Sequence, residues 1–75
     1  MNTVDLSMIL ASILEEDYGY YLIAVTDDYV IVDQTMTYMI DVKEDVDEIM
    51  HLYPDLRDVR LRVSQDSQGI MIELI

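Results

Sequence analysis

The spacing of the apolar residues changes along this 75-residue chain, and that change constrains the fold more than any other feature. Apolar residues first recur every three to four positions, which is the repeat of one face of an α-helix. Short β-branched and aromatic runs follow, and then a second helical pattern and two further runs. The first helical stripe consists of Leu6, Ile9, Leu10, Ile13 and Leu14. The succession of these patterns predicts an α+β fold.

The two predicted helices have recognisable ends. We expect the first over residues 3–17, with Gly19 as the left-handed residue that follows its C-terminus. Asp41, with an acidic residue three positions later, resembles a capping box, and a second helix is expected over residues 42–53. Pro54 cannot continue a helix and should stop it.

The strand-like runs predict a sheet. Short polar segments separate most of them, which favours antiparallel pairing through tight turns. The predicted strands are residues 20–25, 29–32, 35–40, 59–63 and 70–74. The order of elements is then α-βββ-α-ββ. We expect a single domain, residues 1–75, with a mostly antiparallel sheet and both helices on one face. The second helix could cross over between parallel strands.

Charge is the outlying property of the composition. Sixteen acidic residues and four basic ones give a net charge of −12. Thirteen of the acids and a single base, Lys43, lie in residues 1–56, whereas residues 57–75 sum to zero. A field of this sign repels nucleic acid and anionic lipid, and it accelerates association with a protein that carries a positive cleft. We therefore expect a basic protein as the partner, and no direct binding of nucleic acid or membrane.

The absence of three sequence features suggests a compartment. The chain has no Cys, no signal-peptide pattern at its start, and no apolar run of the roughly 18 residues that a membrane span needs. We expect a soluble, unprocessed, cytoplasmic protein.

The sequence offers little for catalysis. His51 is its only imidazole, and it lies near a helix end that favours a cation, so no pairing of a nucleophile with a base can be assembled. Gly19 and Gly69 are too far apart to form a phosphate-binding loop. Glu48 and His51 have the Glu-x-x-His spacing of helical-bundle metal sites, but the second copy that such a site needs is missing. We predict no enzyme activity, no catalytic residue, no metal and no cofactor.

The acidic residues are the candidate binding site. On the second helix they lie in the first turns, where the helix dipole favours negative charge and helix stability alone can explain them. Glu15, Glu16 and Asp17 stand at the unfavourable end of the first helix, where each should cost roughly 0.3–1 kcal/mol, and this points to a use in binding. Aromatic residues interleave with the acids as bases do with phosphates. The predicted partner-binding residues are Glu15, Glu16, Asp17, Asp27, Asp28, Asp33, Asp41, Glu44, Asp45, Asp47, Glu48, Tyr20 and Tyr29.

One short segment carries a resemblance to a known family. Residues 63–69, Val-Ser-Gln-Asp-Ser-Gln-Gly, are similar to the last hairpin turn of the uracil-DNA glycosylase inhibitors, which also begin with a short amphipathic helix. In size, acidity and lack of Cys the chain looks like the small phage-encoded inhibitors of the DNA-mimic class, which include anti-CRISPR and anti-restriction proteins. The glycosylase inhibitors have a Gln-Glu-Ser-Ile strand after their first helix, where this chain has Val-Thr-Asp-Asp-Tyr, so no inhibitory residue is transferred. The resemblance implies evasion of host defence within the host cytoplasm.

These observations lead to one hypothesis and one main alternative. The chain is expected to mimic nucleic acid and to occlude the basic groove of a nuclease, CRISPR effector, restriction enzyme or repair enzyme. The alternative is a non-enzymatic adaptor or structural subunit, with a homodimer as one form, that binds through an apolar sheet face or an edge strand. Halophilic adaptation also explains an acid-rich chain, although the many large apolar residues argue against it.

Overall fold

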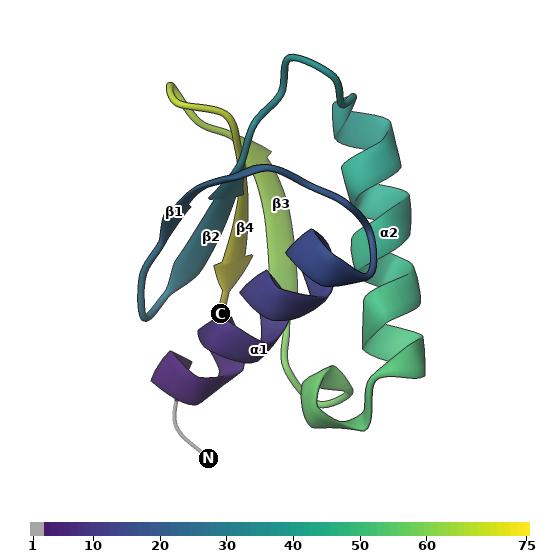
Figure 1. Cartoon of the computed structure of the whole chain (residues 1–75). Helices are drawn as coiled ribbons and strands as arrows, with labels where there is room; N and C mark the ends of the chain where they lie inside the picture. The colour runs from purple at the N-terminus through teal and green to yellow at the C-terminus, as the bar shows by residue number, and fades with distance from the viewer. Residues whose placement is uncertain (1–2) are drawn as a thin grey trace.

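The computed structural model describes the backbone of residues 3–75 and the side chains of residues 6–75, and it confirms an α+β fold. Within that range the chain forms two α-helices, a short 3₁₀-helix and a four-stranded sheet (Figure 1). The elements are α1 (Thr3–Glu16), β1 (Leu22–Val25), β2 (Tyr29–Val32), α2 (Met39–Leu52), η1 (Pro54–Leu56), β3 (Leu61–Gln65) and β4 (Ile70–Leu74). Both expected helices are present, and so are the expected hairpins β1–β2 and β3–β4.

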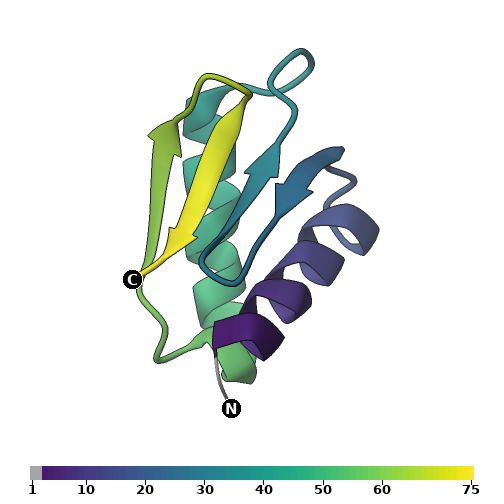
Figure 2. The same ribbon diagram turned by 90° about the vertical axis from the view of Figure 1, so that its left-hand side faces the viewer.

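The sheet contains a crossover connection. Its strands lie in the order β1-β2-β4-β3, and every neighbouring pair is antiparallel. Because β2 and β3 both run antiparallel to β4, which lies between them, they are parallel to each other (Figure 2). The α2 helix connects these two strands, so the crossover that the sequence suggested is confirmed.

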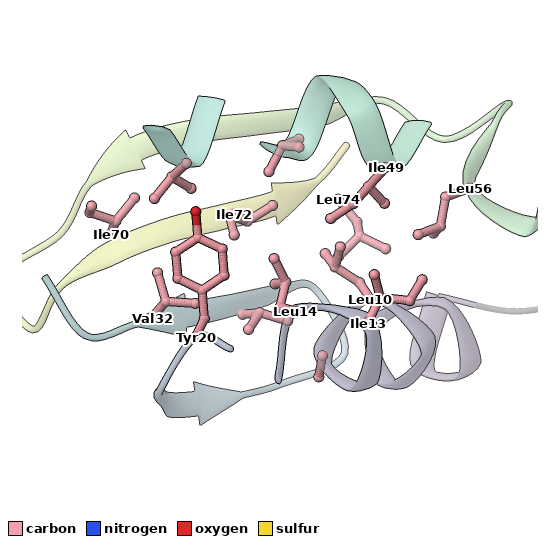
Figure 3. Close-up of a cluster of buried hydrophobic side chains, with 14 residues drawn as sticks. Leu10, Ile13, Leu14, Tyr20, Val32, Ile49, Leu56, Ile70, Ile72 and Leu74 are labelled. Carbon is pink, nitrogen blue, oxygen red and sulfur yellow. The ribbon is translucent and has the colours of Figure 1, made fainter. Parts of the chain in front are cut away.

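Both helices cover the same face of the sheet, as expected (Figures 1 and 2). The α1 helix packs against β1 and β2, and α2 packs against β3. Leu10, Leu14 and Ile49 are fully buried between the helices and the sheet (Figure 3). A chain of this length has a small core, so truncating any one of these side chains to Ala should cost about 2–5 kcal/mol, a large part of the total stability.

The strand predicted over residues 35–40 does not form, and the sheet in the described chain has four strands rather than five. The N–H of Thr37 donates to the carbonyl of Gln34 at 3.4 Å, and the Thr35 hydroxyl donates to the Asp33 carboxylate, so a turn replaces the strand. The physical reason lies in β2, whose two edges already pair with β1 and β4. A further hairpin strand directly after β2 therefore has no free edge to join.

The start of α2 also differs from the expectation. The helix begins at Met39, and Tyr38 is its N-cap residue, without a side-chain cap hydrogen bond. Asp41 lies within the first turn, so the predicted capping box at this position was wrong. Asp41 still lies where the helix dipole favours an acid.

The second face of the sheet carries no helix from the described residues. Successive strand residues point to opposite faces, and Val30, Val32 and Ile72 belong to the core, so Ile31 and Met71 point to this open face. The same alternation places Arg62 on the open face, as predicted, where it pairs with Glu73 at 2.5 Å. The open face thus combines an apolar row with an ion pair.

Candidate functional site

Tyrosine hydroxyls and carboxylates join the end of α1 to α2. Tyr18 donates to Oε1 of Glu48 at 2.5 Å, and Tyr53 donates to Oδ2 of Asp17 at 2.5 Å. Tyr20 donates to Oδ2 of Asp45. In each pair the two residues are at least 25 positions apart, so these hydrogen bonds depend on the tertiary fold. We call this set the tyrosine–carboxylate seam: Asp17, Tyr18, Tyr20, Asp45, Glu48 and Tyr53.

The turn after α1 brings its tyrosines to α2. Gly19 has a φ of +75°, the left-handed conformation that the sequence predicted for it. The N–H of Tyr20 then donates to the carbonyl of Leu14 at 2.9 Å, which closes the helix end. The Tyr20 ring lies in the core beside Val32, with its hydroxyl directed toward α2 (Figure 3). The polar end of a buried ring is thus satisfied by a carboxylate of the second helix.

Three acids of α2 fall on one side of the helix because of their spacing. Asp41, Asp45 and Glu48 are at i, i+4 and i+7, and a helix rises about 1.5 Å per residue, so they are about 6 Å and about 4.5 Å apart along the axis. The buried residues of α2 have the same spacing one position later. The acids therefore line the border of the buried stripe, beside the seam tyrosines. We call Asp41, Asp45 and Glu48 the α2 acidic row.

The seam keeps its protons on the tyrosines. Burial, followed by the hydrogen bond to Glu48, raises the pKa of Tyr18. Burial and then the hydrogen bond to Asp45 raise the pKa of Tyr20, and the nearby charge of Asp41 adds to this. The hydrogen bond to Asp17 is the main cause of the raised pKa of Tyr53. Because each hydroxyl donates and each carboxylate accepts, the negative charges are held in place without being neutralised.

The predicted cluster at the end of α1 does not act as one group. Glu15 lies at a shallow groove between α1 and β1, which is also lined by Met8 and Val25. Glu16 accepts a hydrogen bond from the hydroxyl of Ser12 at 2.9 Å. Asp17 alone belongs to the seam. The helical repeat sends these neighbouring side chains in different directions.

The remaining predicted acids lie at separate places. Asp27 and Asp28 occupy the β1–β2 turn, where the Thr26 hydroxyl accepts the backbone N–H of Asp28 at 3.2 Å. Asp33 follows β2, at the opposite end of the sheet from that turn (Figure 1). Glu44 and Asp47 are exposed on α2. The structure therefore gathers the α2 acidic row with Asp17, and leaves the turn acids apart.

The two predicted tyrosines occupy different surroundings. Tyr20 is only 8% exposed, so its ring is a core element and only its hydroxyl reaches the seam. Tyr29 is half-buried in β2, opposite Glu73 of β4.

Sequence reasoning assigned no binding role to several exposed side chains. Tyr21, Met36, Tyr38 and Ile40 are 78%, 92%, 76% and 65% exposed. The last three are at alternate positions of residues 35–40, so a strand there would have placed all three on one face of the sheet. The sequence held one local signal of this exposure. When the helical repeat of the buried residues of α2 is continued backward from Val42, Ile40 does not fall on the buried stripe.

Comparison of the chain with protein-family models, with curated proteins and with solved structures gave no match. Of the helices in residues 3–75, none has the length and apolar character needed to cross a membrane. The same part of the chain contains no group of three or more Asp, Glu or His side chains placed to hold a metal ion.

Proposed function

We propose that this chain is a cytoplasmic inhibitor that mimics nucleic acid and occludes the basic DNA- or RNA-binding groove of a host defence or repair enzyme. The observation that carries the proposal is the α2 acidic row, with Asp17 beside it, held by the seam hydroxyls. A nucleic-acid-binding groove is built to meet negative charges on a regular, stiff backbone. Carboxylates at fixed intervals on a helix supply such charges.

The distribution of basic residues supports the same partner class. Residues 1–42 contain no Lys, Arg or His, and Lys43 is the only Lys or Arg up to residue 56. The three Arg residues, at positions 57, 60 and 62, follow in the neutral part of the chain around β3. The negative field of the α1–β1–β2–α2 part is therefore almost unopposed. Such a field should give fast, salt-sensitive association with a positive groove.

The mechanism needs no chemistry on the inhibitor. Lys and Arg side chains that normally meet phosphates would pair with the carboxylates of the row. Because the seam hydrogen bonds already fix two of these carboxylates, less side-chain entropy is lost on binding than for freely rotating acids. The bulk of the domain would then exclude the substrate from the groove.

A direct test uses the proteins of a bacterial lysate that bind to a duplex-DNA resin. The immobilised chain should retain one of these proteins in about 50 mM salt, release it well below about 1 M salt, and release it when free duplex DNA is added. The triple variant Asp41→Asn, Asp45→Asn, Glu48→Gln keeps hydrogen-bond acceptors but removes the charge of the row, and it should lose most of this retention.

The matched control removes three charges elsewhere, through Asp55→Asn, Asp58→Asn and Asp66→Asn. It should retain the protein nearly as well as the unmodified chain. Equal loss in both triple variants would show that only net charge matters, and retention that is insensitive to salt and DNA would contradict the mimicry.

A second candidate function rests on the open face of the sheet. Ile23 is 41% exposed on the face without a helix, where the half-buried Met71 also lies, whereas Ile31 on the same face is only 3% exposed. An adaptor or homodimer could bury the exposed surface of Ile23 and Met71. Light scattering distinguishes the two candidates, because a dimer that persists unchanged in high salt favours the sheet face.

A further inference from the structure

Among the side chains that the structure describes, the four most exposed large apolar ones lie in or next to the connection between β2 and α2. Met36 and Tyr38 are 92% and 76% exposed in this connection, and Ile40 is 65% exposed in the first turn of α2. Tyr21, 78% exposed, is joined to the start of the connection because its carbonyl accepts the N–H of Asp33 at 2.8 Å. We call Tyr21, Met36, Tyr38 and Ile40 the β2–α2 patch. Side chains this exposed add almost nothing to the core, so their apolar surface is free for a partner.

The backbone that displays the patch is held in a defined shape. The Thr35 hydroxyl donates to the Asp33 carboxylate, and the Thr37 N–H donates to the Gln34 carbonyl at 3.4 Å. The amide of Gln65, at the end of β3, donates to Oε1 of Gln34 at 2.6 Å and ties the connection to the second hairpin. A connection that is already ordered loses less conformational entropy when it binds. The patch is therefore suited to act as a rigid anchor.

Acids flank the patch on two sides. Asp33 precedes Met36 in the connection, and Asp41 follows Ile40 in α2, at the start of the α2 acidic row. One base, Lys43, also lies beside the patch, one helical turn after Ile40, and no other base follows before His51, so the acids outnumber the bases around the patch. An apolar surface with a negative rim is complementary to an apolar recess with a positive rim. A second copy of this chain, which carries the same charge, is a poor match.

We infer that the β2–α2 patch inserts into an apolar recess of the partner, framed by Lys and Arg side chains, while the α2 acidic row lies along the adjoining positive groove. The inference rests on the proposed function, because it places the recess where the partner's groove would receive bases between its phosphate-binding side chains. Tyr and Met suit this role, since an aromatic ring stacks as a base does and a thioether adapts to an irregular recess. The patch sets the lifetime of the complex, and the acidic row sets its rate of formation.

The test again uses the lysate proteins that bind to duplex-DNA resin. The double variant Met36→Ser, Tyr38→Ser should raise the dissociation rate of the retained protein at least about tenfold and leave the salt dependence of association unchanged. The matched control is Met8→Ser, Leu52→Ser, which removes apolar side chains that are 62% and 63% exposed outside the patch. It should change the rate by less than about twofold.

A photo-cross-linking residue in place of Tyr38 should bond to the retained protein, and one in place of Met8 should not. All the altered side chains are exposed, so circular dichroism and the unfolding midpoint should match those of the unmodified chain. Unchanged dissociation of the patch variant overturns the inference, as does a cross-link that joins only two copies of this chain. If the acidic-row variant still loses retention in that case, the proposed function stands without the patch. A different outcome is that the patch variant loses a retained protein that free duplex DNA does not displace. That outcome contradicts the mimicry of nucleic acid, and the patch then docks a partner by another mode.

Discussion

The hydroxyl of Tyr18 donates a hydrogen bond to Oε1 of Glu48 with 2.5 Å between the oxygens, although the two residues are 30 positions apart. This bond ties the segment after α1 to the middle of α2 and gives one carboxylate of the α2 acidic row a fixed position. Tyr20 and Asp45 form a similar bond one turn nearer the start of α2. The negative surface is thus part of the tertiary structure as well as of the composition.

Replacing Tyr20 with Phe should lower the free energy of unfolding by about 1.5–3 kcal/mol. The ring remains in the core, but its hydroxyl no longer donates to Asp45, and hydrogen bonds to charged groups contribute at this level. Urea unfolding followed by circular dichroism measures the change. Tyr21→Phe is the control, because Tyr21 is 78% exposed, and its stability should stay within about 0.5 kcal/mol of the unmodified chain. Equal effects of the two substitutions would remove the seam as a stabilising element.

Stability should fall in alkaline solution because of the seam. The pKa values of Tyr18 and Tyr20 are raised above the ordinary 10.0, so the folded chain holds these protons more tightly than the unfolded chain does. This contribution is fully present below about pH 10 and is lost as the pH rises further, because only the unfolded chain then releases the protons. The urea midpoint, measured from about pH 8 to about pH 11.5, should fall steeply above about pH 10. The urea midpoint of the double variant Tyr18→Phe, Tyr20→Phe should be lower at about pH 8 and should fall less as the pH rises.

Neutralising an acid at the C-terminal end of α1 and one at the N-terminal end of α2 should change the free energy of unfolding in opposite directions. Glu15→Gln removes a negative charge from the last turn of α1, where the helix dipole is also negative, and should raise the free energy of unfolding by about 0.3–1 kcal/mol in low salt. Asp41→Asn removes an acid from the first turn of α2 and should lower it by a similar amount. Both effects should shrink in about 1 M salt. Changes of the same sign would mean that net charge outweighs the helix dipoles.

Alanine substitutions at the two glycines of the chain should lower the free energy of unfolding by different amounts. A Cβ on Gly69 would meet the backbone carbonyl of Val32 and lie 3.2 Å from Cγ2 of Ile31, and a backbone atom in a paired strand cannot move aside easily. Gly69→Ala should therefore cost about 2–3 kcal/mol or more. Gly19 has a φ of +75° but no atom within 4 Å of an added Cβ, so Gly19→Ala should cost only about 1–2 kcal/mol. Thermal unfolding of both variants shows which one is less stable. A larger loss of stability in Gly19→Ala than in Gly69→Ala would contradict the close packing around Gly69.

Local sequence patterns were sufficient for most of the secondary structure. The helical spacing from Leu6 to Leu14 marks α1, and Pro54 marks the end of α2, because both signals act within a few residues. The strand predicted over residues 35–40 was wrong because β-branched and aromatic residues form a strand only where a sheet has a free edge for them to join. Whether β2 has such an edge depends on β4, about 40 positions further along the chain, and no local pattern reports this pairing.

Local patterns in the chain were enough to specify the two helices, the β1–β2 and β3–β4 hairpins and the confinement of the net charge to residues 1–56. Which acids stand together depends on the packing of segments that are distant in the chain. The tertiary structure separated Glu15 and Glu16 from Asp17, placed Asp27 and Asp28 at a remote turn, and brought Tyr18 and Tyr20 onto the acids of α2. It also left Met36 and Tyr38 exposed in place of an expected strand. The physical reason is that charge and periodicity are properties of neighbouring residues, whereas a shared surface depends on contacts between segments that only the packed core brings together.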